Sequence, residues 1–148
     1  IAVELRTAGY GGRDIRESVV VHTNDPRSPV VELMVSGTVE LFADIQPKHV
    51  MLTGRLGEPV AAVVQIVPRP DRPFKIKNIR ATRGHHIRFS LADTPGADGT
   101  RYELTITSAR QDAGSISDVI LLDTDSPIRS TLQVTVFGMI NEAKKETP

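Results

Sequence analysis

The sequence predicts an all-β protein with a sandwich of two sheets, and three observations lead to that prediction. The 148 residues include eleven Gly and ten Pro but only four Phe, two Tyr and no Trp. This composition, together with many Val, Ile and Thr, is typical of short strands joined by tight turns. Apolar and polar residues alternate in several segments, which is the pattern of strands with one buried face. A long N-terminal segment also recurs near the C-terminus.

The recurring segment has a period of 101 residues. Residues 2–39 align without a gap with residues 103–140, and Glu17 and Leu33 meet the conservative partners Asp118 and Val134. The identical pairs are Ala8 and Ala109, Ile15 and Ile116, Thr23 and Thr124, Pro26 and Pro127, Val35 and Val136, and Gly37 and Gly138. A match that keeps turn residues and strand parity together predicts an internal duplication.

The duplicated segment is expected to contain three strands. The first, in "IAVELRTA" and "YELTITSA", alternates apolar and polar residues, as in Val3 and Leu5. The second, in "IRESVVVHT" and "ISDVILLDT", is more continuously apolar, as expected of a central strand. The third, in "VVELMVSGTV" and "TLQVTVFGMI", places its apolar residues on one face. The connections "NDPRS" and "DSPIR" are predicted hairpin turns, because Asn or Asp bonds nearby backbone and Pro cannot donate to a ladder.

Further strands are predicted between the two copies. "ELFADIQP" and "HVMLTG" are typical of short strands, and "GEPVAAVVQIVP" of a long buried one. "PFKIKNI" and "HIRFSLA" follow, and "DTPGADGT" turns the chain. Seven or eight strands in about 100 residues are typical of a β-sandwich. We therefore predict a complete sandwich domain in residues 41–140, the last three strands of a preceding repeat in residues 1–40, and a tail or linker in residues 141–148.

Two stretches resemble a known family. The T-N-D-P-x-x-P hairpin of residues 23–29 follows "LRTAGYGG" and leads into a strand that ends in small-Gly-x-Val. These residues resemble the C-terminal signature of bacterial immunoglobulin-like domains of unknown function, which are related to the ASH, HYDIN and major-sperm-protein repeats. "IQPKHVMLTGRLGEPVAAVVQI" is similar to the opening of such domains.

The resemblance implies an immunoglobulin-like β-sandwich in tandem repeats, and the 101-residue period described above leaves the N-terminal repeat truncated to its last three strands. It implies a non-catalytic structural or protein-interaction module of a larger bacterial protein. It also implies an extracytoplasmic location, in the periplasm or cell envelope. The cysteine-bearing loop often found midway through these domains is absent here, so a redox or metal role of that loop has no residues in this chain.

No catalytic motif or cofactor site is predicted. The absence of Cys removes thiolate ligands and cysteine nucleophiles. The sequence has no G-x-S-x-G motif and no spacing that suggests a Ser-His-Asp set. The glycine-rich stretches "GYGGRD" and "TGRLGEP" lack the Lys of a phosphate loop. We therefore expect no enzymatic activity.

No metal site is predicted either. Adjacent His85 and His86 point to opposite faces of an extended chain, and the other histidines are His22 and His49. Two acidic pairs suggest calcium only weakly, because neither has the D-x-D-x-D-G pattern with its closing Glu. These pairs are Asp93 with Asp98 and Asp123 with Asp125.

The best candidate for a ligand site is a basic segment. Between Arg69 and Arg88 the chain carries seven Arg or Lys residues against one Asp. The candidate ligand or partner residues are Arg72, Lys75, Lys77, Arg80 and Arg88. Phe74, Ile76, Ile87 and Phe89 are expected to point inward, so Lys75, Lys77 and Arg88 share one basic surface if their strands are neighbours.

That basic surface supports an alternative function, a cell-envelope carbohydrate-binding or anionic-ligand-binding module. Loop aromatics such as Tyr10 or Tyr102 would contribute to a sugar site. The alternative, purely structural interpretation of the same charges is a solvated face that protects exposed strands from aggregation.

Protein partners are the leading expectation. Eighteen basic residues balance eighteen acidic ones, which disfavours nucleic acid as a partner. No apolar run approaches the about 18 residues that a membrane span needs. The chain begins with Ile, so we expect a fragment of a longer protein. Because three strands cannot bury both faces of a sandwich, we predict a homodimer through the exposed strands of residues 1–40, with Met34 and Phe137 as contacts.

Overall fold

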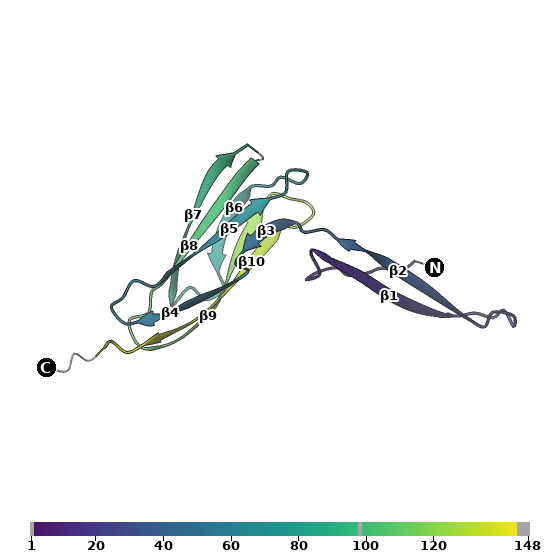
Figure 1. Ribbon diagram of the computed structural model, residues 1–148, viewed down its shortest axis with the longest axis horizontal. Helices are drawn as coiled ribbons and strands as arrows, with labels where there is room; N and C mark the ends of the chain where they lie inside the picture. The colour runs from purple at the N-terminus through teal and green to yellow at the C-terminus, as the bar shows by residue number, and fades with distance from the viewer. Residues whose placement is uncertain (1, 98, 145–148) are drawn as a thin grey trace. The chain divides into compact units, whose positions relative to one another are not determined.

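The structure, a computed structural model, describes residues 2–97 and 99–144. These residues contain strands and no helix, and so none that could cross a membrane. The chain divides into two units, Ile1–Phe42 and Ala43–Pro148, with the break close to the expected boundary at residue 40. Figure 1 shows the strands of both units, which are described separately below. Of the predicted tail, residues 145–148 lie outside the described part.

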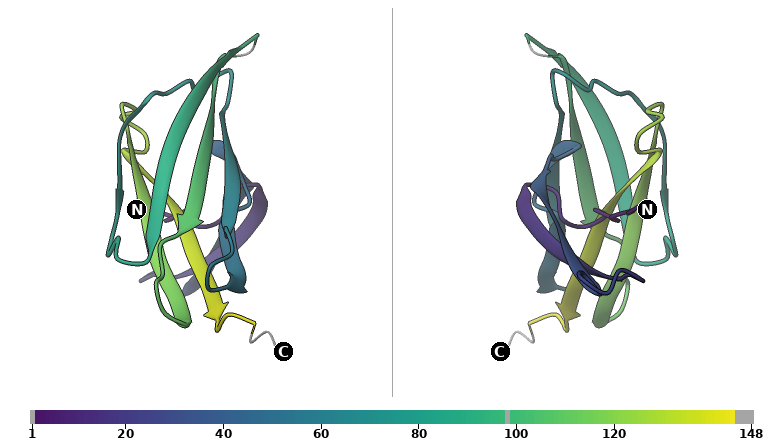
Figure 2. Two further views of the ribbon diagram at one scale, coloured as in Figure 1. Left: turned by 90° about the vertical axis from the view of Figure 1, so that its left-hand side faces the viewer. Right: turned by 90° about the vertical axis from the view of Figure 1, so that its right-hand side faces the viewer.

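The second unit is an immunoglobulin-like sandwich of eight strands, and Figures 1 and 2 show its two sheets face to face. One sheet is antiparallel, in the order β3 (Ala43–Gln46), β5 (Ala61–Pro68), β8 (Gly99–Ser108) and β7 (Ile87–Gly96). The other has the order β4 (His49–Arg55), β10 (Thr131–Asn141), β9 (Gly114–Thr124) and β6 (Ile76–Ala81). In this second sheet β4 pairs parallel with β10, and the remaining pairs are antiparallel.

The core lies between the inner faces of these sheets. Alternate residues of the central strands point inward because side chains change sides at every residue of a strand. Their fully buried members are Val64 and Ile66 of β5, Leu104 and Ile106 of β8, Ile120 and Leu122 of β9, and Leu132, Val134 and Val136 of β10. Burying a side chain of this size contributes about 1.5–3 kcal/mol. The expected inward positions are confirmed for the second copy of the repeated strands.

Two details of the second unit differ from expectation. The predicted long buried strand over 57–68 begins only at Ala61, and its Val63 and Gln65 are exposed. It alternates because each sheet faces the core on one side only. The predicted turn over 93–100 is shorter, since β7 continues to Gly96 and β8 begins at Gly99. Asp98 lies outside the described residues.

The first unit is a hairpin of two strands, β1 (Arg13–His22) and β2 (Val30–Val39). The prediction of a further strand in residues 1–8 is wrong, because residues 2–12 contain no strand. The matching strand of the second unit, β8, belongs to the opposite sheet and pairs with β5 and β7. The described residues of the first unit provide no such partners, so the backbone of this segment has no ladder to join.

The β1–β2 hairpin is equivalent to the β9–β10 hairpin residue for residue. Both form ten antiparallel pairs, and every pair of the first, such as Arg13 with Val39, corresponds after 101 residues to a pair of the second. The turns share the same hydrogen bonds. The Thr23 hydroxyl accepts the Asp25 N–H at 3.1 Å, and the Thr124 hydroxyl accepts the Ser126 N–H at 3.2 Å.

The expected bond from an acidic side chain to the backbone two residues on is present in the first turn, where the Asp25 carboxylate accepts the N–H of Arg27 at 2.9 Å. The Thr23 and Thr124 hydroxyls also donate to the carbonyl oxygens five residues on. The Asp125 carboxylate instead accepts the N–H of Lys75, which precedes β6, at 2.7 Å.

Candidate interaction surfaces

Part of the predicted basic segment is neutralised by carboxylates. Arg69 Nε lies 2.8 Å from Asp71 Oδ1, and Arg72 Nε lies 3.8 Å from Asp71 Oδ2. Arg80 Nη2 lies 3.2 Å from Asp123 Oδ1 across the β6–β9 pair. The hydrogen bond from Arg69 lowers the pKa of Asp71, and the hydrogen bond from Arg80 lowers the pKa of Asp123. Arg72 and Arg80 are therefore less available to an anionic ligand than the sequence suggests.

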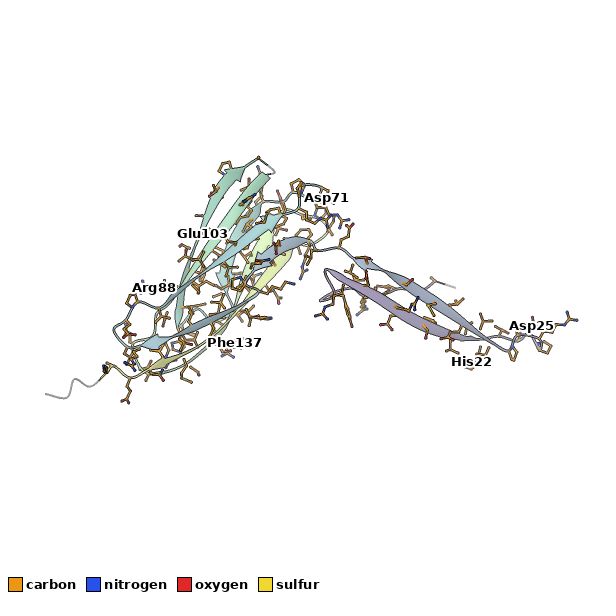
Figure 3. All side chains as sticks on the ribbon, in the orientation of Figure 1. His22, Asp25, Asp71, Arg88, Glu103 and Phe137 are labelled. Carbon is orange, nitrogen blue, oxygen red and sulfur yellow. The ribbon has the colours of Figure 1, made fainter. Side chains whose placement is uncertain are left out.

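The remaining predicted patch residues are exposed but belong to different sheets. Lys75 precedes β6, Lys77 lies where the β6 register shifts, and Arg88 lies in β7. β6 is an edge strand of one sheet and β7 is an edge strand of the other. The strands are not paired, so the condition for one continuous basic sheet surface is not met. Figure 3 marks Arg88 on its strand and Asp71 in the connection between β5 and β6.

The two tyrosines considered for a sugar site lie in different environments. Tyr10 is exposed in a turn, where its N–H bonds the carbonyl oxygen of Thr7. Tyr102 is buried on the inner face of β8 and stacks on Phe74, with ring centroids 6.4 Å apart. Its hydroxyl donates to the Phe74 carbonyl oxygen at 3.4 Å. The expectation that Tyr102 is a loop aromatic is therefore wrong, because its strand parity places it in the core.

The candidate metal ligands do not converge. The rings of His85 and His86 have centroids 6.4 Å apart, and the two side chains are exposed. Throughout residues 2–97 and 99–144, no group of three or more His, Asp and Glu side chains is arranged to hold a metal ion. Asp98, one member of the acidic pairs, lies outside those residues.

Three large apolar side chains are exposed together on the outer face of the β4–β10 pair. Met51 and Phe137 are directly paired across the two strands, and Met139 follows Phe137 on the same face. Their exposed fractions are 68%, 45% and 47% respectively. Their neighbours in register, Thr53 and Ser117, are small and polar. We call Met51, Phe137 and Met139 the apolar cluster, and Figure 3 labels Phe137 within it.

The sequence identified Phe137 as an outward residue but missed Met51. A signal for Met51 exists in "HVMLTG", where three apolar residues follow one another. In a strand the middle one must point away from its neighbours. Because Val50 and Leu52 are buried, Met51 is exposed.

Asp118 is the buried carboxylate of the sandwich. It accepts hydrogen bonds from the backbone N–H groups of Arg83 and Gly84, at 3.0 and 2.7 Å, and from that of Val119 at 2.8 Å. Burial acts to raise the pKa of Asp118, but the Gly84, Arg83 and Val119 amides outweigh it, so the pKa lies below the ordinary 3.8. Asp118 thus anchors the β6–β7 connection to β9, which is a structural role.

Comparisons with known proteins give a likeness of fold. No model of a known protein family matches the sequence, and no curated protein matches it. A crystal structure of a protein of unknown function from Porphyromonas gingivalis W83 aligns with a TM-score of 0.51 and 17% identity, over 91% of this chain and 68% of that chain. The ASH / PapD-like domain 7 of human CEP192 aligns with a TM-score of 0.41 and 12% identity, over 70% of this chain and 87% of that chain. At 17% identity and a TM-score of 0.51, the first of these structures shows a likeness of fold and nothing more.

Proposed function

We propose that this chain is a non-catalytic protein-interaction module of a larger protein built from tandem immunoglobulin-like repeats. The observation that carries the proposal is the apolar cluster of Met51, Phe137 and Met139 on the outer face of β4 and β10. Contiguous exposed apolar side chains ringed by polar residues mark binding surfaces for other proteins. Aromatic residues and Met are enriched at the centres of such surfaces.

The partner that fits this cluster is a protein surface with apolar side chains of its own. Phe137 provides a large rigid anchor, and the two methionines adapt to the shape of what covers them. Thr53 and Ser117 at the margin provide hydroxyl groups for a polar rim. The cluster contains no charged group, so affinity at this surface is expected to vary little with salt.

The tandem arrangement is supported by the two equivalent hairpins, which share register and turn hydrogen bonds. A location in the periplasm or cell envelope is part of the proposal and rests on the family resemblance. Fractionation of the source cells tests that location.

The main experiment compares the parent chain with two variants, Phe137→Asp and Gln133→Asp. Gln133→Asp is a matched control on the same strand and face. Each chain is immobilised, and proteins retained from an extract of the source organism are quantified by mass spectrometry. We expect at least one partner to fall about tenfold or more for Phe137→Asp and to be unchanged for Gln133→Asp. Identical retention by all three chains, with equal thermal stability, would contradict the proposal.

The homodimer through the strands of residues 1–40 stays a prediction. Light scattering and sedimentation over a range of concentrations test it. A strict monomer at the highest concentration would exclude this dimer.

A second candidate function is anion binding by the exposed Lys75 and Lys77, for which no ion pair is present among the described residues. Heparin is a suitable probe. We expect weak retention that Lys75→Ala with Lys77→Ala abolishes, and that falls steeply as salt increases. Retention that does not change with salt would argue against this function.

A further inference from the structure

We infer that one face of the β1–β2 hairpin is a docking surface for six strands of an immunoglobulin-like repeat, equivalent to β3–β8 and carried ahead of the hairpin on the same polypeptide. We call this face the inner face. It is defined by the residues whose counterparts in the second unit are buried: Ile15, Glu17, Val19, Val21, Val31, Leu33, Val35 and Val39.

The apolar residues of the inner face match a core that is covered in the second unit. Val31, Leu33 and Val35 correspond to Leu132, Val134 and Val136, all of which are buried. In the first unit none of the twenty described residues of β1 and β2 is buried, and Leu33 is 37% exposed. A two-stranded hairpin is marginally stable alone, so an apolar face of this extent indicates a missing layer.

Gly37 is an independent sign of the missing layer. Glycine inside a strand weakens it, and often marks a close approach of another backbone. At the equivalent Gly138 an added Cβ would collide with the carbonyl oxygen of Leu52 in β4. At Gly37 an added Cβ would meet no described atom within 4 Å. The glycine is therefore required only when a strand equivalent to β4 lies beside β2.

Glu17 is a second independent sign. It is an exposed carboxylate on an otherwise mostly apolar face, and it corresponds to Asp118. Asp118 is held by backbone N–H groups of Arg83 and Gly84, in the connection between β6 and β7. These two amides lie outside the hairpin, whereas the third donor to Asp118, the N–H of Val119, lies in β9 itself. An acid at this position is explained when the covering layer presents the same turn to it.

The connection to the hairpin identifies the source of the cover. Val3 and Leu5 correspond to Leu104 and Ile106 of β8, which lie buried in the covering sheet. The segment just ahead of β1 thus corresponds to the last of the six covering strands. A second copy of this chain is a poorer occupant, because its own β3–β8 strands are already covered by its β9–β10 hairpin.

The inference uses the repeat relation in the proposed function but not the apolar cluster. A negative result for Phe137→Asp therefore does not contradict the docking of the hairpin. A negative result for the inner face does not contradict the proposed interaction at the apolar cluster.

The test measures amide hydrogen exchange in the chain as it exists and in an extended chain. In the extended chain, a copy of residues 43–108 is joined ahead of Ala8 in place of residues 1–7, which keeps the 101-residue period. In the chain as it exists, we expect the amides of β1 and β2 to exchange about 100-fold or more faster than those of β9 and β10. In the extended chain, we expect them to slow by about 100-fold.

Variants of the extended chain separate docking from a general effect of the added residues. Leu33→Asp on the inner face is expected to restore fast exchange, whereas Met34→Asp on the opposite face is not. Gly37→Ala is expected to restore fast exchange in the extended chain and to change nothing in the unextended one.

The positive control carries a copy of residues 43–141 ahead of the chain. This copy includes its own β9–β10 hairpin, whose amides should exchange slowly because the β3–β8 strands cover it. Fast β1–β2 exchange in the extended chain while this control is protected would overturn the inference. So would equal effects of Leu33→Asp and Met34→Asp. Slow exchange of β1 and β2 in the unextended chain would also overturn it, and if that protection rises with concentration, a second copy is the occupant.

Discussion

Replacing Gly138 by Ala tests whether the parallel β4–β10 pair is as closely packed as the structure indicates. A Cβ at this position would lie 3.1 Å from the carbonyl carbon and the Cβ of Leu52, and closer still to the carbonyl oxygen. That oxygen cannot rotate away, because β4 is paired along His49–Arg55 and its Val50 and Leu52 are buried. The backbone must shift, and the buried side chains with it.

The expected cost follows from these contacts. Overpacking a filled core costs about 1–3 kcal/mol, and a fixed backbone atom places Gly138→Ala at the upper end of that range. Ala also restricts the unfolded chain more than Gly does, and this effect stabilises the folded state by less than about 1 kcal/mol. We therefore expect a net loss of about 2 kcal/mol, which for a unit of about 100 residues lowers Tm by about 8–16 °C.

Circular dichroism and urea unfolding measure this loss, with Gly37→Ala as the matched control. Nothing described lies within 4 Å of a Cβ at Gly37, so the sandwich transition of that variant should coincide with that of the parent chain. A Tm for Gly138→Ala within about 2 °C of the parent, or an equal fall for Gly37→Ala, would refute the reasoning.

Three further predictions concern the sandwich. Asp118→Ala should destabilise it by about 2–4 kcal/mol in urea at neutral pH, because three amide hydrogen bonds to a carboxylate are lost. Folding lowers the pKa of Asp118, so its contribution to the free energy of unfolding is complete above the ordinary carboxyl pKa and disappears as pH falls through the lower pKa of the folded state. The stabilities of the variant and the parent should therefore converge in acid. Arg110→Ala should cost about 1–3 kcal/mol, because the guanidinium bonds two carbonyls and a carboxylate of the β8–β9 connection and the Ser115 carbonyl of β9, whereas exposed Arg88→Ala should change Tm little. Leu122→Ala should cost about 2–5 kcal/mol and half-buried Leu121→Ala less, and equal losses would argue against the assigned strand parity.

Strand positions were predictable where alternation and turn chemistry agree. The pattern in "TLQVTVFGMI" places Leu132, Val134 and Val136 inside and Phe137 outside, as the structure confirms. Side-chain parity along one strand is a local property, so the sequence carries it. The acid in "ISDVILLDT" breaks an apolar strand and could have been recognised as a buried anchor, since it recurs as Glu17 in the other copy.

The candidate surfaces were less predictable, because they depend on which strands become neighbours. Lys77 and Arg88 are close in sequence, yet their strands lie in different sheets. Met51 and Phe137 are far apart in sequence, yet parallel pairing places them side by side. Arg80 looks free in the sequence, but its strand pairs with that of Asp123.

The sequence alone determined the all-β class, the repeated hairpin and the side of each strand that faces inward, because turn residues and period-two alternation act over a few residues. Only the tertiary structure decided the sheet order, and with it the exposed apolar cluster and the amides that hold Asp118. It also decided that residues 2–12 form no strand. A strand requires hydrogen-bonding partners, and alternation within a segment carries no information about whether those partners are present.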